Sequence, residues 1–235
     1  MKIKNKILSI MVVLLLFSGT IFTDSVCYAI RYDNYISSRY SSSRYVYNAI
    51  VDVDKYRYIS YNPSPSLNVK DQGDKNICVA EAISSLKTLQ KFRATGSLKE
   101  LDYQYVWDNG SKDSNGMFVM KTLQKLKKAK DKDYKITYVK KTKNIDLVKE
   151  GILNYYGVLV DTQYDRNFCS TGKSNILKVG GRKYGYHTML ITGWKKIAGK
   201  EYWVVQNSWG RNWGNKGICY MPFNYSNIKS YYITY

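Results

Sequence analysis

A cysteine, a histidine and an asparagine in this sequence could together carry out nucleophilic chemistry. Cys78 stands at the start of an apolar run, and His187, the one histidine among 235 residues, lies 20 positions before Asn207. A thiol nucleophile needs an imidazole that takes its proton and a polar group that orients the imidazole. With a single histidine, no other side chain is a ready general base near neutral pH. The three residues therefore predict a Cys-His-Asn catalytic site.

Gln72 lies six residues before Cys78 and could complete this site. Its side-chain amide, together with the backbone N–H of Cys78, is placed to bind the negative oxygen that develops during attack on a carbonyl. Cys78 also begins a predicted helix, where backbone N–H groups and the helix dipole favour an anion, so we expect a lowered pKa for its thiol. Taken alone, a cysteine at a helix start fits a buried structural cysteine better than a nucleophile. Gln72 before it and His187 and Asn207 after it reverse this preference.

The elements that must position these residues are helices first and strands second. Apolar residues at helical spacing predict a helix from Cys78 to Gly96 and another over 118–129, and a third helix begins after Asn144 and ends at Gly157. Strands are predicted at 158–160, 187–193, 202–207, 217–221 and 231–235. This order predicts an α+β protein with a helical part and a sheet part.

The N-terminal residues have the pattern of a secretory signal peptide. Three lysines precede an apolar run from Ile7 to Phe22, and cleavage is expected after the small residue Ala29. A permanent membrane anchor is the alternative, but polar residues at 18–20 interrupt the run. We predict a signal peptide at 1–29, a flexible arm or short pro-segment at 30–62, and a catalytic domain at 63–235. The mature protein would be extracellular or associated with the cell wall, with no membrane span.

The net charge of the chain indicates which partners its surface would attract. A formal charge of +19 favours anionic surfaces such as cell-wall polymers, and nucleic acid is the weakest of these partners for an exported chain. Compositional bias explains the charge equally well.

Three cysteines, Cys78, Cys169 and Cys219, would remain after processing, so at least one thiol is free. If two of them pair, they are Cys169 and Cys219. Cys219 also fits a buried apolar thiol. One histidine and no Cys-x-x-Cys pair predict no metal, and no organic cofactor is implied.

Several segments resemble the papain-like cysteine peptidases. Residues 69–73 resemble the family's segment before the nucleophile, 185–193 its histidine strand, and 202–214, with Asn-Ser-Trp-Gly, its asparagine block; 101–105 is a weaker match. The resemblance covers 67–221 and implies that the domain at 63–235 is a papain-like peptidase domain. It implies a papain-like two-lobed fold, with a helical N-terminal lobe, a β-sheet C-terminal lobe and the active-site cleft between them.

The resemblance also implies roles. Cys78 would be the nucleophile, His187 the general base, Asn207 its orienter and Gln72 the oxyanion donor. Asn115 and Gly116 partly match the substrate-backbone site. Trp209 is predicted to bind substrate with them and to shield the His–Asn bond. We expect a secreted, bacterial member of the family, a cysteine endopeptidase that hydrolyses peptides or proteins through an acyl-thioester.

The sequence departs from the family pattern near the nucleophile. Val79 replaces a tryptophan, Glu81 stands where an apolar residue is usual, and Met117 follows Gly116. His187 lies 109 residues after Cys78, against about 130–150 in the family. Two alternatives remain: an acyl-transfer enzyme acting on cell-wall peptides, and a degenerate, non-catalytic binding module.

Overall fold

The longest helix within residues 67–235 begins at the proposed nucleophile. Residues 67–235 are described by this computed structural model; the predicted signal peptide at 1–29 and arm at 30–62 lie outside the described residues. Helix α4 spans Cys78–Thr95, and Gly96 ends it in the left-handed conformation with φ 70°. Glycine adopts that conformation without a Cβ penalty. The predicted helix and its C-terminal stop are both confirmed.

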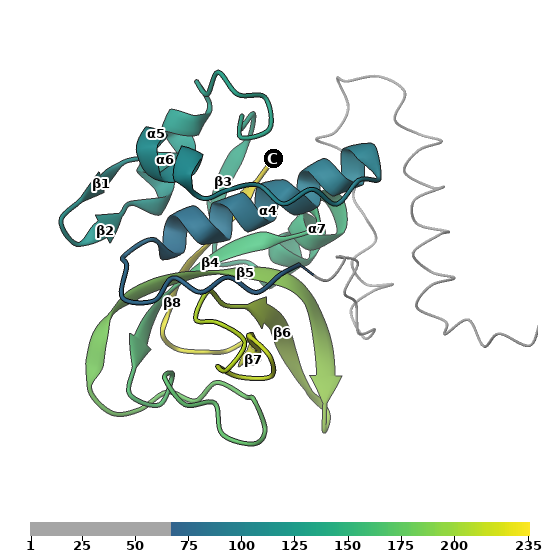
Figure 1. The fold of residues 1–235 in the computed structure, drawn as a ribbon. Helices are drawn as coiled ribbons and strands as arrows, with labels where there is room; N and C mark the ends of the chain where they lie inside the picture. The colour runs from purple at the N-terminus through teal and green to yellow at the C-terminus, as the bar shows by residue number, and fades with distance from the viewer. Residues whose placement is uncertain (1–66) are drawn as a thin grey trace, which may run out of the picture. The chain divides into compact units, whose positions relative to one another are not determined.

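Short elements follow α4 and form the rest of the helical part (Figure 1). They are α5 (Gln104–Asn109), the two-stranded hairpin of β1 (Lys112–Asp113) and β2 (Gly116–Met117), and α6 (Val119–Leu126). Helix α6 lies within the predicted span of 118–129. The core of this part is a set of apolar side chains from α4 and α6 with little or no exposure: Ile83, Leu86, Leu89, Leu123 and Leu126.

A six-stranded antiparallel sheet forms the second part. Its strands are β3 (Val139–Thr142), β4 (Val158–Asp165), β5 (Lys183–Ile197), β6 (Lys200–Gln206), β7 (Ile218–Pro222) and β8 (Ile228–Thr234), in the order β3-β8-β4-β5-β6-β7. The five predicted strands are confirmed, with longer bounds for most of them. Strand β8 pairs with both β3 and β4, so this C-terminal strand joins β3 to the rest of the sheet.

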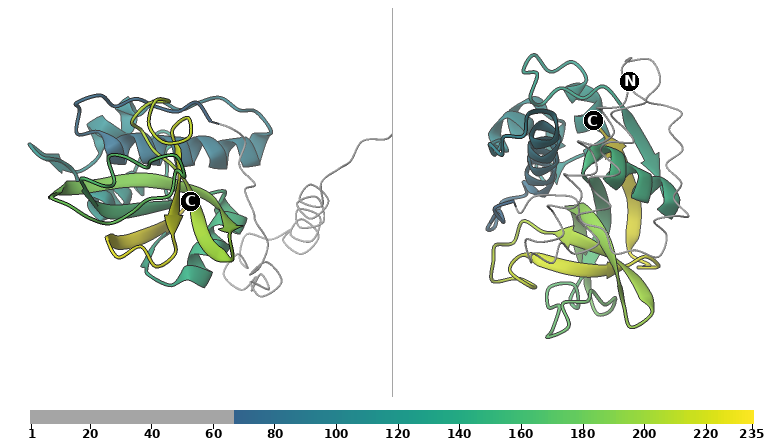
Figure 2. Two further views of the ribbon diagram at one scale, coloured as in Figure 1. Left: turned by 90° about the horizontal axis from the view of Figure 1, so that it is seen from below. Right: turned by 90° about the vertical axis from the view of Figure 1, so that its right-hand side faces the viewer.

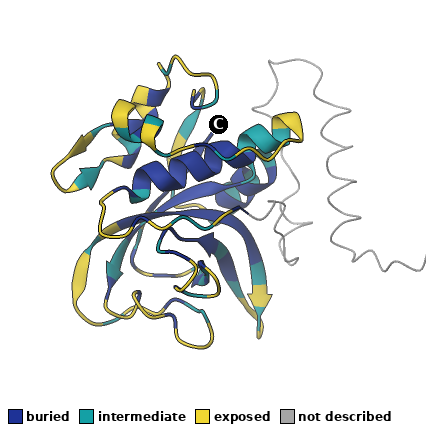
Figure 3. Ribbon diagram, viewed as in Figure 1, coloured by how far each residue is buried: buried dark blue, intermediate teal, exposed yellow. Residues whose placement is uncertain are grey.

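Two helices pack against opposite faces of this sheet. Leu159, Leu190 and Tyr232 belong to the same core as α4. Their strand neighbours Val158 and Ile233 lie against Gly151 of α7 (Ile145–Tyr155). Successive side chains of a strand point to opposite faces, so α4 covers one face and α7 the other. Figure 2 shows the molecule from two further sides, and Figure 3 shows the buried band where α4 meets the sheet.

The third predicted helix is confirmed as α7. The Asn144 side chain caps it and accepts hydrogen bonds from the backbone N–H groups of Asp146 and Leu147. Its last turn closes on Tyr156, with φ 64°, one residue before the predicted stop at Gly157. The α+β class is thus confirmed. Among the described residues, no helix is long and apolar enough to cross a membrane.

Candidate active site

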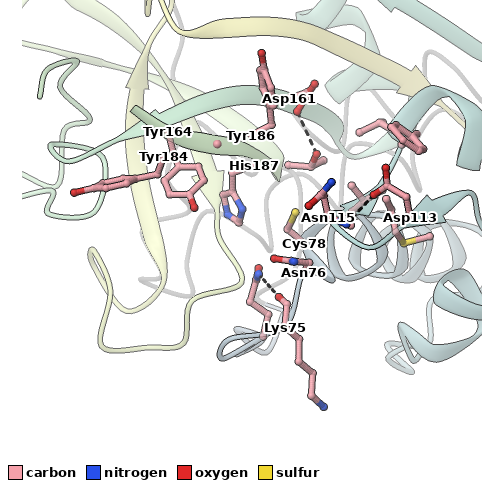
Figure 4. A pocket seen from close by; sticks show the side chains of 18 of the residues that line it. Lys75, Asn76, Cys78, Asp113, Asn115, Asp161, Tyr164, Tyr184, Tyr186 and His187 are labelled. Carbon is pink, nitrogen blue, oxygen red and sulfur yellow. Dashed lines mark hydrogen bonds between the residues drawn. The ribbon is translucent and has the colours of Figure 1, made fainter. Parts of the chain in front are cut away.

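Cys78 and His187 come from the two parts of the molecule and line one cleft of about 1040 Å³. Cys78 is the first residue of α4, and His187 lies on β5, opposite Thr162 of β4. Figure 4 shows the thiol and the imidazole in the same region of the cleft. The fold therefore brings together two side chains that the sequence separates by 109 positions.

The His187 ring is held by Asn207, which follows β6. Its Nε2 lies 2.6 Å from Asn207 Oδ1. The backbone N–H of Ser208 also donates to Asn207 Oδ1, at 2.8 Å, which identifies this amide atom as the oxygen. An amide oxygen only accepts, so His187 Nε2 carries a hydrogen and donates it. In the neutral imidazole Nδ1 is then the unprotonated nitrogen, available to take a proton.

Aromatic rings surround this His–Asn pair. The ring centroid of Trp209 lies 4.7 Å from that of His187, and Phe168 and Tyr164 approach the imidazole edge-on at 6.0 and 6.1 Å. His187 is 3% exposed and Phe168 is fully buried. Exclusion of water lowers the local dielectric and strengthens the hydrogen bond between the imidazole and the amide. Trp209 thus lies where it shields that bond.

Gln72 is fixed to the same block of chain. Its backbone N–H donates to Ser208 O at 2.8 Å, and its Oε1 accepts from Ser208 Oγ at 2.7 Å. Its Nε2 donates one hydrogen to Lys75 O at 2.7 Å. A primary amide has two N–H hydrogens, so one remains for another acceptor. Because Gln72 also lines the cleft, that hydrogen is available to a group bound there.

The pKa values of the pair move in opposite directions. Burial raises the pKa of the Cys78 thiol; backbone N–H groups of Thr188, Val79 and Cys78 act against this, and the Asp161 charge adds to it. Burial lowers the pKa of His187 to about 4, although its bond to Asn207 favours the charged form. The lowered thiol pKa predicted from the helix start is therefore wrong in its net direction, because desolvation outweighs the N–H groups. In this form both side chains are neutral near pH 7.

The predicted substrate residues also line the cleft. Asn115 and Gly116 lie in and beside the β1–β2 hairpin, and the backbone N–H of Asn115 donates to Asp113 Oδ1 at 2.8 Å. A Cβ at Gly116 would come within 3.2 Å of Asn76 O, and its φ is 126°. A side chain at this position would be strained and would crowd Asn76, so the hairpin favours glycine here.

Glu81 points away from the cleft. Its side chain is 4% exposed and lies beside a cavity of about 10 Å³ that Asn207 and Ser208 also line. Burial raises the pKa of Glu81, while Lys70 acts in the opposite direction. Glu81 is absent from the groups that shift the Cys78 pKa. This departure from the family pattern therefore does not act directly on the pKa of the thiol.

The other two cysteines within residues 67–235 are unpaired. Cys169 is exposed and Cys219 is buried, and both are free thiols. Burial raises the pKa of Cys219 strongly, as expected for an inert core thiol. The structure contains no Cys169–Cys219 disulfide. Among the described residues, no cluster of three His, Cys, Asp or Glu side chains could hold a metal ion.

Three residues near the site had been given no role from the sequence. Ser208 links Asn207 to Gln72, Phe168 packs on the imidazole, and Asp161 lines the cleft beside Thr188. Ser208 lies inside the Asn-Ser-Trp-Gly segment, so its position was available as a signal. Asp161 reaches the site through the pairing of β4 with β5, and Phe168 through the turn that follows β4. No local pattern indicated either residue.

The fold and this arrangement define a class, the cysteine-type peptidases. The model of the papain family of cysteine proteases matches residues 68–234. The chain belongs to the papain family of cysteine proteases.

Individual relatives are similar over shorter stretches. "Cathepsin B-like cysteine proteinase 3" of Ostertagia ostertagi is 41% identical over 58 residues, 24% of this chain and 33% of that protein. "Peptidase 1" of Dermatophagoides pteronyssinus is 38% identical over 53 residues, 23% of this chain and 17% of that protein. These matches span a third or less of the relatives' lengths. Among solved structures, xylellain, a cysteine protease from Xylella fastidiosa, superimposes with a TM-score of 0.63 at 14% identity, covering 74% of this chain and 85% of that one.

Proposed function

We propose that this protein is a secreted cysteine endopeptidase that uses Cys78, His187, Asn207 and Gln72. The observation that carries the proposal is the 2.6 Å contact between His187 Nε2 and Asn207 Oδ1, with Ser208 fixing the amide. This contact leaves Nδ1 as the basic nitrogen in the cleft that Cys78 lines. A papain-family chain with that tautomer has the base that a thiol nucleophile requires.

The reaction proceeds in two steps. Cys78 Sγ attacks the carbonyl carbon of the scissile peptide while its proton passes to His187 Nδ1. The oxyanion accepts hydrogen bonds from the free Gln72 Nε2–H and from the backbone N–H of Cys78. His187 then gives the proton to the leaving amine, and an acyl-thioester remains. Water adds to the thioester with His187 as base, which releases the carboxylic acid and restores the thiol.

Neutral starting forms of Cys78 and His187 fit this scheme. Proton transfer within the pair creates a thiolate and an imidazolium together, and each charge stabilises the other. Asn207 accepts from Nε2–H throughout, so the ring plane stays fixed when the charge appears.

Alanine variants test the assignment. We expect Cys78→Ala and His187→Ala each to lower kcat/KM on a fluorogenic peptide by more than about 10⁴-fold, and the double variant to be no worse than either, because the two residues act as a unit. Gln72→Ala should lower it by about 10²–10³-fold while leaving alkylation of Cys78 by iodoacetamide intact. Activity of Cys78→Ala equal to wild type would contradict the proposal.

Cell-wall acyl transfer would use the same residues with an amine in place of water. Product analysis by mass spectrometry in the presence of an amino-acid amide separates the two: hydrolysis gives free acids, and transfer gives amides.

Export and surface binding are the remaining parts of the proposal. The sequence pattern at 1–29 supports a secreted protein that begins near Ile30, which N-terminal sequencing of secreted material tests. The formal charge of +19 supports retention on anionic wall polymers. Such binding should be lost near 1 M salt, where the Debye length is about 3 Å.

A further inference from the structure

Asp161 places a carboxylate in the proposed catalytic cleft. It lies on β4 and pairs with Thr188, the residue after His187 on β5. It lines the same cleft as Cys78, and Figure 4 shows it on the side of the cleft away from Lys75. Its charge acts on Cys78 and also on Tyr232. Asp161 is therefore close to the nucleophile without belonging to the catalytic group.

The sheet face on which Asp161 lies explains this position. Leu159, two residues earlier, points to the face that packs against α4, and so does Tyr232 opposite it. Strand alternation puts Asp161 on the same face. Leu159 is fully buried, whereas Asp161 is only half-buried. Asp161 thus stands where the apolar core opens into the cleft, with Tyr232 on its core side.

The carboxylate has no cation of its own. Its one hydrogen bond comes from Thr188 Oγ1 and is long, at 3.5 Å. No ion pair between described residues involves it. Lys141 and Lys229 act on it only through their more distant charges, and burial raises its pKa to about 6, so it is ionised at neutral pH. A partly desolvated carboxylate without a partner is stabilised by any cation that reaches it.

The charge around the cleft favours such a cation. The protein as a whole is strongly basic, at +19. The charged side chains that line the cleft have instead a small acidic excess: Asp74, Asp113 and Asp161, against Lys75 and Lys121. Local excess of one sign in a cleft raises the concentration of the opposite charge there.

We propose that Asp161 forms a subsite that binds the cationic side chain of a lysine or arginine residue in the substrate, next to the scissile bond. The aliphatic stem of that side chain packs against Tyr232 and Thr188, and its charged end meets the carboxylate. This inference rests on the proposed peptidase function and adds the class of substrate. It makes Asp161 a specificity-determining residue.

Irreversible peptidyl chloromethyl ketones test the subsite without requiring turnover. Pairs of probes carry lysine or norleucine at each of the three positions before the reactive group, because norleucine keeps the stem and lacks the charge. The rate of Cys78 labelling is followed by intact mass on the full processed chain. At one position we expect lysine to react about 10–100-fold faster than norleucine, the range for a charge-assisted contact.

Two variants separate the subsite from general charge. In Asp161→Asn, which keeps the shape, the lysine-to-norleucine ratio should fall to about one. The ratio is the readout because loss of the Asp161 charge also acts on the pKa of the Cys78 thiol and changes both labelling rates together. Asp74→Asn removes a negative charge from the same cleft, so it controls for general attraction and should keep the ratio.

Each outcome has a distinct meaning. A ratio near one at every position in wild type, or a ratio that Asp161→Asn leaves unchanged, overturns the subsite while labelling by norleucine probes keeps the nucleophile assignment. Loss of the ratio in both variants replaces the subsite with general attraction. Absence of Cys78 labelling by every probe overturns the peptidase proposal, and the subsite with it.

Discussion

At the scale of single residues, Ser208 connects the two halves of the proposed catalytic apparatus. Its N–H fixes the Asn207 amide, its hydroxyl donates to Gln72 Oε1, and its carbonyl accepts from Gln72 N–H. Orientation of the imidazole and of the oxyanion donor thus depends on one residue. The sequence supplied the types and spacing of Cys78, His187 and Asn207, but the two hydrogen bonds between Ser208 and Gln72 exist only once residues 136 positions apart meet.

Ser208→Ala tests this connection. The variant keeps both backbone contacts and removes only the hydroxyl, which leaves the buried Gln72 oxygen without its donor. We expect kcat to fall about 10-fold, since an unsatisfied buried polar group costs about 1–3 kcal/mol. Alkylation of Cys78 should stay at the wild-type rate, and Ser208→Thr, which restores a hydroxyl, should recover part of the loss. An unchanged kcat in Ser208→Ala would remove Ser208 from the positioning of Gln72.

Asp161 is expected to reduce stability at neutral pH. Burial raises the pKa of Asp161 in the folded protein from 3.8 to about 6. As the pH rises, the carboxyl group therefore ionises at a lower pH in the unfolded chain than in the folded protein. The penalty is absent below pH 3.8, grows between about pH 4 and 6, and is complete above pH 6. Asp161→Asn should therefore increase the free energy of unfolding by about 2–3 kcal/mol at pH 7 and change it little at pH 4.

Urea unfolding of wild type and Asp161→Asn at the two pH values measures this effect. Equal stability of both proteins at pH 7 would show that the carboxylate is well solvated. If Asp161→Asn raises the stability and also abolishes the preference for lysine, Asp161 serves substrate binding at the expense of stability. Such a trade-off is common for functional residues.

At the scale of elements, strongly periodic segments were predictable and short or polar ones were not. Helix α4, capped by Gly96, and helix α7, capped by Asn144, carry their signals within the sequence. Strand β3 reads Val-Lys-Lys-Thr, without apolar alternation, because it is a largely exposed edge strand that only β8 pairs. Helix α5 has six residues, of which only Val106 is buried. Long-range contacts, rather than local preference, hold both of these elements.

The cap of α7 gives a prediction at this scale. Asn144→Ala removes the acceptor of two backbone N–H groups at the helix start. Thermal or urea unfolding should show a loss of about 1 kcal/mol, and Asn144→Asp should retain most of the stability. Because α7 packs on the sheet face opposite to α4, labelling of Cys78 should be unaffected. A change in the labelling rate would show that the two faces are coupled.

At the scale of the whole molecule, the cleft depends on both ends of the described chain. Gln72 and Cys78 lead into and begin α4, and β8 near the C-terminus supplies Tyr232 to the cleft. The sequence resemblance was followed only to residue 221, whereas the family match extends to 234. The last strand was predicted from its composition, but its insertion between β3 and β4 depends on pairing that no local pattern specifies. The short spacing from Cys78 to His187 does not separate them, because α4 packs directly against β4 and β5.

The central claim is that Cys78 is a nucleophile activated by His187, and one measurement tests it most directly. Wild type, Cys78→Ala and His187→Ala are incubated with a peptidyl epoxide, and their intact masses are followed over time. The account predicts one inhibitor mass on wild type, none on Cys78→Ala, and labelling slowed by at least about 10²-fold in His187→Ala, because the thiol then lacks its proton acceptor. Labelling of Cys78→Ala at the wild-type rate, or equal rates for His187→Ala and wild type, would contradict it.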